Sequence, residues 1–180
     1  MALTCALTAA PAAAGPRVWQ PKDGAVTEGE VEVHARPSTV YRALTEYAKW
    51  PALFSDIAWS AVKSGGRENA VIQFKSHTFP KPQHVRFRNT HNRLVRYELI
   101  DGPSGVKVQW ETAIEPNADR GTTKIRIRLT VVVGGIYGWI VTKEKVRKYR
   151  ESKMTKDVRD LAKHFPPPKP APATAPTPPT

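Results

Sequence analysis

Charged and apolar residues alternate without a break from Lys124 to Leu129, in the order Lys-Ile-Arg-Ile-Arg-Leu. Successive side chains of a β-strand point to opposite faces of a sheet, so this alternation predicts a strand with one buried face and one face in water. Turn residues such as Gly65-Gly66 and Asp101-Gly102-Pro103 divide the preceding chain into segments of the same kind. We therefore expect antiparallel strands at 59–63, 70–79, 84–88, 94–100, 106–114 and 122–133.

Helical spacing of apolar residues precedes this run of strands. A first strand is expected at 30–36, where Val31 and Val33 alternate with charged residues. Apolar residues then recur every three or four positions over 37–47, which predicts a helix with Pro37 in its first turn. A second short helix is expected at 52–57, after Pro51.

The last ordered element is predicted to be one long helix over 136–164. Its apolar face holds Val146, Tyr149, Val158 and Leu161 at spacings of three and four. We expect its charged residues on the opposite face, where the cations are partly balanced by acidic neighbours: Lys143, Lys145, Arg147, Lys148, Arg150, Lys153 and Lys156, with Glu144, Glu151, Asp157 and Asp160.

These elements predict one α+β domain over 28–165. A loose lead-in over 16–27 precedes it, and the Pro-rich stretch 166–180 should form an extended, disordered tail. Residues 1–15 resemble the apolar part of a signal peptide with an Ala-x-Ala cleavage pattern, but they lack a cationic start. We expect an exported or periplasmic protein if this leader is a truncated signal, and a cytoplasmic protein otherwise.

The segment Arg36-Pro-Ser-Thr-Val-Tyr-Arg-Ala-Leu-Thr-Glu-Tyr-Ala-Lys-Trp-Pro51 resembles the amino-terminal signature of the START-like superfamily, also called SRPBCC or polyketide cyclase/dehydrase-like. Glu46 stands where the family usually has aspartate. The resemblance implies a helix-grip fold, in which a curved seven-stranded antiparallel sheet surrounds a long carboxy-terminal helix and two short helices follow the first strand. It also implies an apolar cavity, because members bind lipids, sterols, polyketides or quinones and some are enzymes.

Alternation identifies the side chains that would face such a cavity. Trp110 is expected near the middle of the concave face, and Tyr97, Trp110, Tyr149, Ser76 and Thr78 could offer hydrogen bonds to a ligand. An ordinary packed core explains the same pattern, and the two interpretations stay open. The expected ligand-cavity residues are Phe74, Phe87, Tyr97, Leu99, Val108, Trp110, Ile125, Ile127, Leu129, Tyr149, Val158 and Leu161.

No catalytic residue, metal ligand or cofactor is predicted from the sequence. The five histidines form no zinc-binding pattern, and the single cysteine, Cys5, can form neither an intramolecular disulfide nor a cysteine zinc site. No Gly-x-Ser-x-Gly nucleophile motif is present. The side chains expected to point inward include no Asp, Glu or His, so no acid or base is assigned.

A formal net charge of +12 raises the attraction for anionic partners. The basic residues of the strands alternate outward and predict a cationic outer face of the sheet, made of Arg86, Arg88, Arg96, Lys124, Arg126 and Arg128. Aromatic residues do not interleave with them, which argues against nucleic acid and favours anionic lipid headgroups.

Three functional classes follow from these observations. Binding or carriage of a hydrophobic small molecule or lipid by a monomer, at an anionic membrane surface, requires only a cavity with an opening. A polyketide cyclase or dehydratase-like enzyme requires an acid or base inside that cavity. A basic module that binds protein or nucleic acid is the third alternative.

Overall fold

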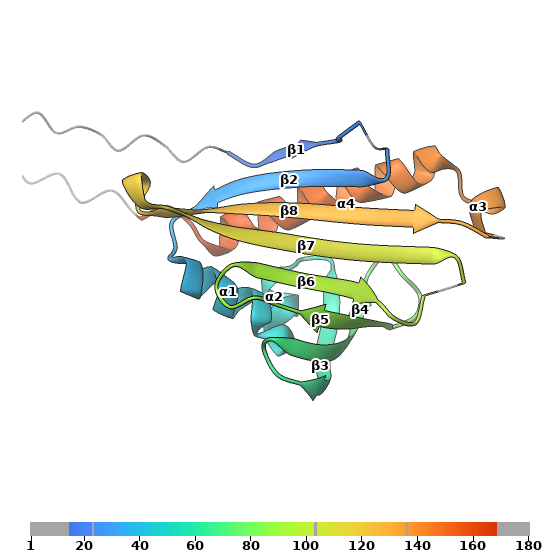
Figure 1. The fold of residues 1–180 in the computed structure, drawn as a ribbon, viewed down its shortest axis with the longest axis horizontal. Helices are drawn as coiled ribbons and strands as arrows, with labels where there is room; N and C mark the ends of the chain where they lie inside the picture. Colours follow the sequence, from blue (N-terminus) through green and yellow to red (C-terminus); the bar gives the residue numbers. More distant parts are fainter. Residues whose placement is uncertain (1–14, 23, 103, 136, 169–180) are drawn as a thin grey trace, which may run out of the picture.

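Eight antiparallel strands form one sheet in the order β1-β2-β8-β7-β6-β5-β4-β3 in a computed structural model of the chain (Figure 1). The structure describes residues 15–22, 24–102, 104–135 and 137–168, so the expected leader and Pro-rich tail fall almost entirely outside the described residues. The strands are β1 Arg17–Trp19, β2 Val26–Val33, β3 Ile57–Gly65, β4 Asn69–Ser76, β5 Gln83–Arg88, β6 Leu94–Leu99, β7 Val106–Asn117 and β8 Thr122–Val133. The helices are α1 Pro37–Thr45, η1 Tyr47–Lys49, α2 Trp50–Leu53, η2 Ala118–Arg120, α3 Tyr137–Ile140 and α4 Lys143–His164.

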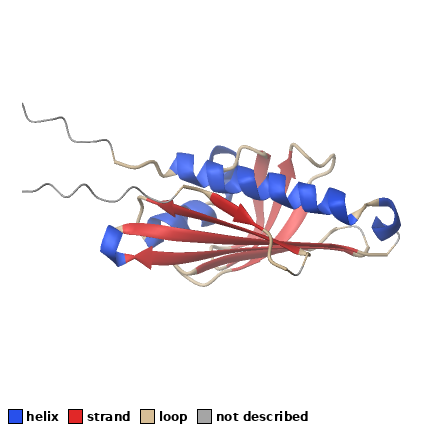
Figure 2. Ribbon diagram, turned by 90° about the horizontal axis from the view of Figure 1, so that it is seen from above, coloured by secondary structure: helices blue, strands red, loops and turns tan. Residues whose placement is uncertain are grey.

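The sheet and the long helix α4 form the two layers of an α+β helix-grip fold. Strands β3 to β8 lie beside one another in chain order, and β2 pairs with β8. Helix α4 lies along one face of the sheet, and the strands fan out beneath it (Figure 2). None of the described helices is both long enough and apolar enough to cross a lipid bilayer.

The β7–β8 hairpin forms the centre of the sheet. It pairs continuously from Val106 opposite Val133 to Asn117 opposite Thr122. Gly121 closes the turn with a φ of 62°, in the left-handed region that favours glycine. Within the alternating stretch of β8, the apolar positions Ile125, Ile127 and Leu129 are buried and the charged positions face outward.

The interior of the domain is completed by the segment that carries the family signature. Proline at position 37 opens α1, whose buried residues include Val40 and Leu44. Trp50 is buried, donates a hydrogen bond from Nε1 to the carbonyl oxygen of Leu44 at 3.1 Å, and contacts the ring of Phe87 edge-on at a centroid distance of 5.4 Å. The Trp-Pro pair therefore fixes the two short helices against the sheet.

Gly29 permits α4 to lie close to β2. A Cβ atom at this position would lie 2.6 Å from Met154 Sδ and 2.8 Å from Val158 Cγ1. Both side chains are buried on the face of α4 that packs on the sheet. A side chain at residue 29 would therefore push the helix away from the sheet.

Besides β4, which ends at Ser76 instead of the predicted Phe79, the sheet differs from the sequence prediction at its amino-terminal end. It has eight strands instead of seven, because Arg17–Trp19 in the expected lead-in pairs with β2. The first predicted strand, 30–36, was also displaced, since β2 runs from Val26 to Val33. The inward position 29 is a glycine, so the first half of β2 lacks the apolar alternation that would have revealed it.

The final helix differs as well. The prediction of one continuous helix over 136–164 was wrong, because a short helix α3 is separated from α4 at Thr142. The Thr142 hydroxyl accepts a hydrogen bond from the backbone N–H of Lys145 at 3.3 Å, as an N-cap does. Three residues that were expected on the charged face are in fact buried, namely Arg150, Asp157 and Asp160. A fourth, Lys153, is mostly covered.

Candidate functional site

A small interior pocket lies between α4 and the half of the sheet formed by β4 to β7. Its volume is about 40 Å³, which accommodates one or two water molecules, whereas pockets for drug-sized ligands measure about 300 to 1,000 Å³. The apolar part of its wall is Phe74, Phe79, Val85, Leu99 and Val108, and the polar part is Asp56, Ser76, Gln83, Tyr97, Tyr149 and Lys153. A larger molecule therefore requires part of the wall to move.

Asp56 and Lys153 of the pocket wall form a charged cluster with Asp157, which does not itself line the pocket. Lys153 Nζ lies 2.5 Å from Asp157 Oδ1 and 3.2 Å from Asp56 Oδ2. The side chains of Lys153, Asp56 and Asp157 are 16%, 3% and 1% exposed. Two carboxylates thus share one ammonium group in the interior, where the absence of acidic groups was predicted, and that prediction was wrong.

Burial and mutual attraction determine the protonation of this charged cluster. Burial opposes the charge on Lys153, but the carboxylates of Asp157 and Asp56 hold its pKa above the usual value. Burial raises the pKa of Asp157 to about 6, and Lys153 partly offsets this shift. Lys153 therefore remains cationic, while Asp157 can exchange a proton close to neutral pH.

The charged cluster also has unused hydrogen-bonding capacity. Among the described residues, Asp157 Oδ2 is buried without a hydrogen-bond partner. Lysine has three N–H donors, and the two carboxylates of the cluster account for two of them. Burial raises the pKa of Tyr149 to about 12 and also raises that of Tyr97, so both hydroxyls stay protonated. Lys153 therefore has an unused donor in the pocket wall, and Asp157, which is bonded to Lys153 but does not line the pocket, has an unused acceptor.

We expect Asp157→Asn to change the pH dependence of stability. The pKa of Asp157 is about 6 in the folded protein and 3.8 as a model value, so the folded state binds more protons between these values and loses stability as the pH rises through them. Asparagine removes this loss. The free energy of unfolding of the variant, relative to the parent, should rise by about 2 kcal/mol between about pH 4 and pH 7. Urea unfolding across this range measures the difference, and a flat difference would contradict the raised pKa.

Two partly exposed aromatic rings of the pocket wall contact each other, and we take this contact as the mouth of the pocket. Phe79, in the loop after β4, contacts Tyr149 of α4 edge-on at a centroid distance of 5.6 Å. The Phe79 backbone is held by Lys75 Nζ, which donates to its carbonyl oxygen, and by Ser76 Oγ, which accepts from its N–H at 3.2 Å. Displacing Phe79 would open the space between the sheet and α4.

The structure divides the expected ligand-cavity residues into two groups. Five of them line the pocket, namely Phe74, Tyr97, Leu99, Val108 and Tyr149. The other seven are buried in the core and do not line it: Phe87, Trp110, Ile125, Ile127, Leu129, Val158 and Leu161. Trp110 lies behind the wall, because its ring stacks on Tyr97 with centroids 5.3 Å apart and an interplanar angle of 17°.

Sequence reasoning missed the residues that give the pocket its polarity. Asp56 and Gln83 lie at or beyond strand ends, where alternation carries no information, and the apolar Phe79 was missed for the same reason. Lys153 had a usable signal, because it lies four residues after Tyr149 and four before Asp157 on one side of α4. Among the described residues, no group of three His, Cys, Asp or Glu side chains could hold a metal ion.

The outer face of the sheet carries ion pairs that the sequence analysis underestimated. The predicted basic residues all lie there, each opposite glutamates on neighbouring strands. Arg126 lies 3.3 Å from Glu30 and 3.8 Å from Glu115. The other pairs are Arg86 and Arg88 with Glu98, Arg96 with Glu111, Lys124 with Glu30, and Arg128 with Glu28. This surface is therefore a mixed-charge face, and its cations are largely compensated.

Comparison with solved structures supports the fold. A START superfamily protein from Mycobacterium smegmatis aligns with a TM-score of 0.63 at 15% identity, over 78% of this chain and 96% of that one. The Zhui aromatase/cyclase from Streptomyces sp. R1128 gives 0.62 at 15% identity, over 83% and 93%. The di-domain ARO/CYC BexL from the BE-7585A biosynthetic pathway gives 0.59 at 19% identity, and the match covers 76% of this chain and 46% of that protein.

The family is identified from the amino-acid sequence rather than from the solved structures. No curated protein matches the chain. Residues 25–166 match the family described as "Polyketide cyclase / dehydrase and lipid transport", and they include the signature segment, the whole β3 to β8 run and α4. The chain therefore belongs to the polyketide cyclase / dehydrase and lipid transport family.

Proposed function

We propose that the protein binds a hydrophobic small molecule that carries a neutral polar group. The observation that carries this proposal is that Asp56 and Lys153 of the charged cluster share the wall of one pocket with apolar side chains. Buried charges cost stability unless they are fully paired, so a protein without a ligand to recognise gains little from placing them there. The apolar part of the ligand would pack against Phe74, Leu99 and Val108.

The charge of the cluster favours a neutral ligand over an anionic one. Two carboxylates and one ammonium leave a net charge of about −1 once Asp157 is ionised. A carbonyl oxygen can accept the remaining proton of Lys153, and a hydroxyl or enol can donate to Asp157 Oδ2. A carboxylate headgroup would meet repulsion instead. Hydrophobic molecules with carbonyl and hydroxyl groups meet both conditions.

Binding requires the pocket to expand beyond its 40 Å³. Phe79, which contacts Tyr149 in the pocket wall, lies in the loop between β4 and β5. Residues 77–82 of this loop contain two prolines and lie outside any helix or strand. We propose that this loop moves aside to admit the ligand.

Displacement of the neutral fluorescent probe N-phenyl-1-naphthylamine tests the proposal. At pH 8, decan-1-ol should displace the probe at concentrations about tenfold lower than decanoate, because decanoate meets the net negative cluster. Lys153→Met should weaken decan-1-ol binding about tenfold or more, since a hydrogen bond to a charged donor is lost. Lys156→Met, at an exposed position of the same helix, is the matched control. Tighter binding of decanoate, or equal binding by both folded variants, would contradict the proposal.

A second candidate function rests on the raised pKa of Asp157. A carboxyl group with a pKa of about 6, near the hydroxyls of Tyr97 and Tyr149, can accept or donate a proton at neutral pH. An enzyme that cyclises or dehydrates a carbonyl-rich hydrophobic substrate needs such a group, and two of the similar structures are named as aromatase/cyclases. Under this alternative, Asp157→Asn would abolish turnover of a model poly-β-ketone while ligand displacement persists.

A further inference from the structure

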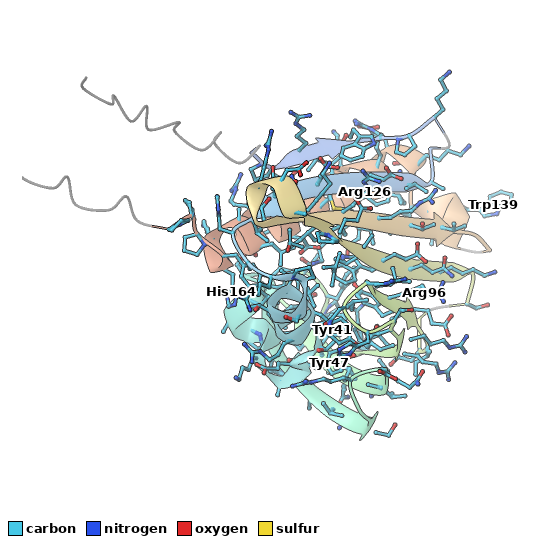
Figure 3. The ribbon with its side chains drawn as sticks, turned by 60° about the vertical axis from the view of Figure 1, so that its left-hand side comes forward. Tyr41, Tyr47, Arg96, Arg126, Trp139 and His164 are labelled. Carbon is cyan, nitrogen blue, oxygen red and sulfur yellow. The ribbon has the colours of Figure 1, made fainter. Side chains whose placement is uncertain are left out.

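The exposed apolar residues at one end of the molecule have no partner in the fold. Trp139 and Ile140 of α3 are 93% and 67% exposed, and Val132, on the adjacent end of β8, is 44% exposed. We call these three residues the α3 tip. Figure 3 shows Trp139 projecting away from the body of the domain.

The local structure holds the α3 tip away from the core. Helix α3 has four residues and follows the turn at Gly134-Gly135, in which Gly135 has a φ of 60°. The N-cap at Thr142 then starts α4 in a fixed direction along the sheet. Burial of a tryptophan stabilises a protein more than burial of almost any other residue. Its exposure on a short helix that is held between a turn and an N-cap therefore indicates a surface that contacts a partner.

Exposed lysines surround the α3 tip. Lys143 and Lys145 are in the first turn of α4, where positive charge opposes the helix dipole and weakens the helix. Neither side chain forms an ion pair with another described residue. Lys107 adds an exposed cation beside the tip, because it pairs in register with Val132. Glu144 is already engaged by Arg147 at 2.6 Å and Lys148 at 3.7 Å.

We propose that the α3 tip docks on an anionic lipid bilayer, with Trp139 and Ile140 entering the headgroup region. Tryptophan prefers this region because its ring is apolar and its N–H is polar, and the lysines meet the negative surface potential. The docking surface lies at the α3 end of the molecule and includes Lys107 and Val132 at the adjoining edge of the outer face, whereas the outer-face arginines are paired with glutamates. This proposal is independent of the proposed ligand, because vesicle binding requires no occupied pocket.

Docking by the α3 tip would also orient the pocket. Tyr149, at the mouth, lies six residues after Lys143, which is about 9 Å along the axis of α4. The Phe79 and Tyr149 rings would therefore lie close to the bilayer surface.

Vesicle flotation of the full chain tests the proposal. The protein should float with phosphatidylcholine vesicles that contain about 30% phosphatidylglycerol and bind pure phosphatidylcholine vesicles much more weakly. Trp139→Ala should reduce the partition coefficient about tenfold, because the residue that enters the bilayer is lost. Trp59→Ala, which removes a 40% exposed tryptophan from β3, is the matched control and should bind like the parent.

Charge substitutions distinguish the two basic surfaces. Lys143→Gln with Lys145→Gln should lower binding to the anionic vesicles about tenfold or more, since each lysine near the surface contributes about fivefold. Arg86→Gln with Arg88→Gln removes the same charge from the outer face of the sheet and should have little effect.

The proposal would be overturned if Trp139→Ala bound vesicles as well as the parent, or if the arginine substitutions lowered vesicle binding more than the lysine substitutions. It would also be overturned if the parent did not bind vesicles and sedimentation showed that it is a dimer which Trp139→Ala abolishes.

Discussion

Lys153→Met should destabilise the protein by about 3 to 5 kcal/mol at neutral pH, because it leaves two buried carboxylates without their shared cation. Asp56 and Asp157 are 3% and 1% exposed in their side chains, so bulk water does not reach them to replace the lost ammonium. The loss should be smaller at about pH 5, since protonation removes the charge of Asp157, whose pKa is raised to about 6. Chemical unfolding at both pH values measures the effect.

The double variant Lys153→Met with Asp157→Asn is the control for this result. It removes one positive and one negative group together, so most of the lost stability should return if the loss arises from an uncompensated charge. Lys156→Met should leave stability nearly unchanged, because Lys156 is exposed on the same helix. If the double variant is as unstable as Lys153→Met, the lost packing of the lysine chain explains the effect.

Trp110→Ala should cost about 3 to 5 kcal/mol, the usual range when a large buried aromatic residue is truncated. Trp110 is 2% exposed, stacks on Tyr97 and meets the ring of Phe54 edge-on with centroids 6.3 Å apart. Its removal therefore leaves a cavity behind the wall of the pocket and releases Tyr97. Thermal or urea unfolding gives the cost directly.

Trp110→Phe separates the packing role of this residue from a role in ligand contact. Phenylalanine keeps a ring against Tyr97, and it removes an indole N–H that has no hydrogen-bond partner among the described residues. We expect a loss clearly smaller than that of Trp110→Ala. Because the indole lies behind Tyr97, decan-1-ol displacement should be unchanged, and a loss of binding in the folded Trp110→Phe variant would place Trp110 at the ligand.

Sequence patterns that reflect local structure, such as alternation within one strand or helical spacing within one helix, were reliable. The alternation over 122–133 coincides with β8, and the helix predicted over 37–47 coincides with α1. The second short helix was misplaced, because α2 spans Trp50–Leu53 instead of 52–57 and Ile57 already begins β3. Patterns failed where distant packing decides the residue type. Gly29 concealed half of β2 because α4 occupies the place of its side chain, and the three paired residues of β1 are too few to show a period.

The candidate site was harder to predict because its central residues break the general rule. Charged residues are almost never fully buried unless they are paired, so Lys153 and Asp157 were placed on the exposed face of α4. Their partner Asp56 precedes β3, 97 residues from Lys153. Spacing along one helix could group Tyr149, Lys153 and Asp157, but only the fold brings Asp56 beside them.

The position of β2 between β1 and β8 has a consequence for how the chain reaches this fold. The hairpins from β3 to β8 join strands that follow one another, so they can form early and locally. Strand β2 must wait for β8, since Val31 pairs with Ile125, and α4 covers both only afterwards. On a ribosome, β2 would therefore have only the short β1 as a partner until most of the domain had been synthesised, and the burial of Lys153 with its carboxylates would be among the last steps of folding.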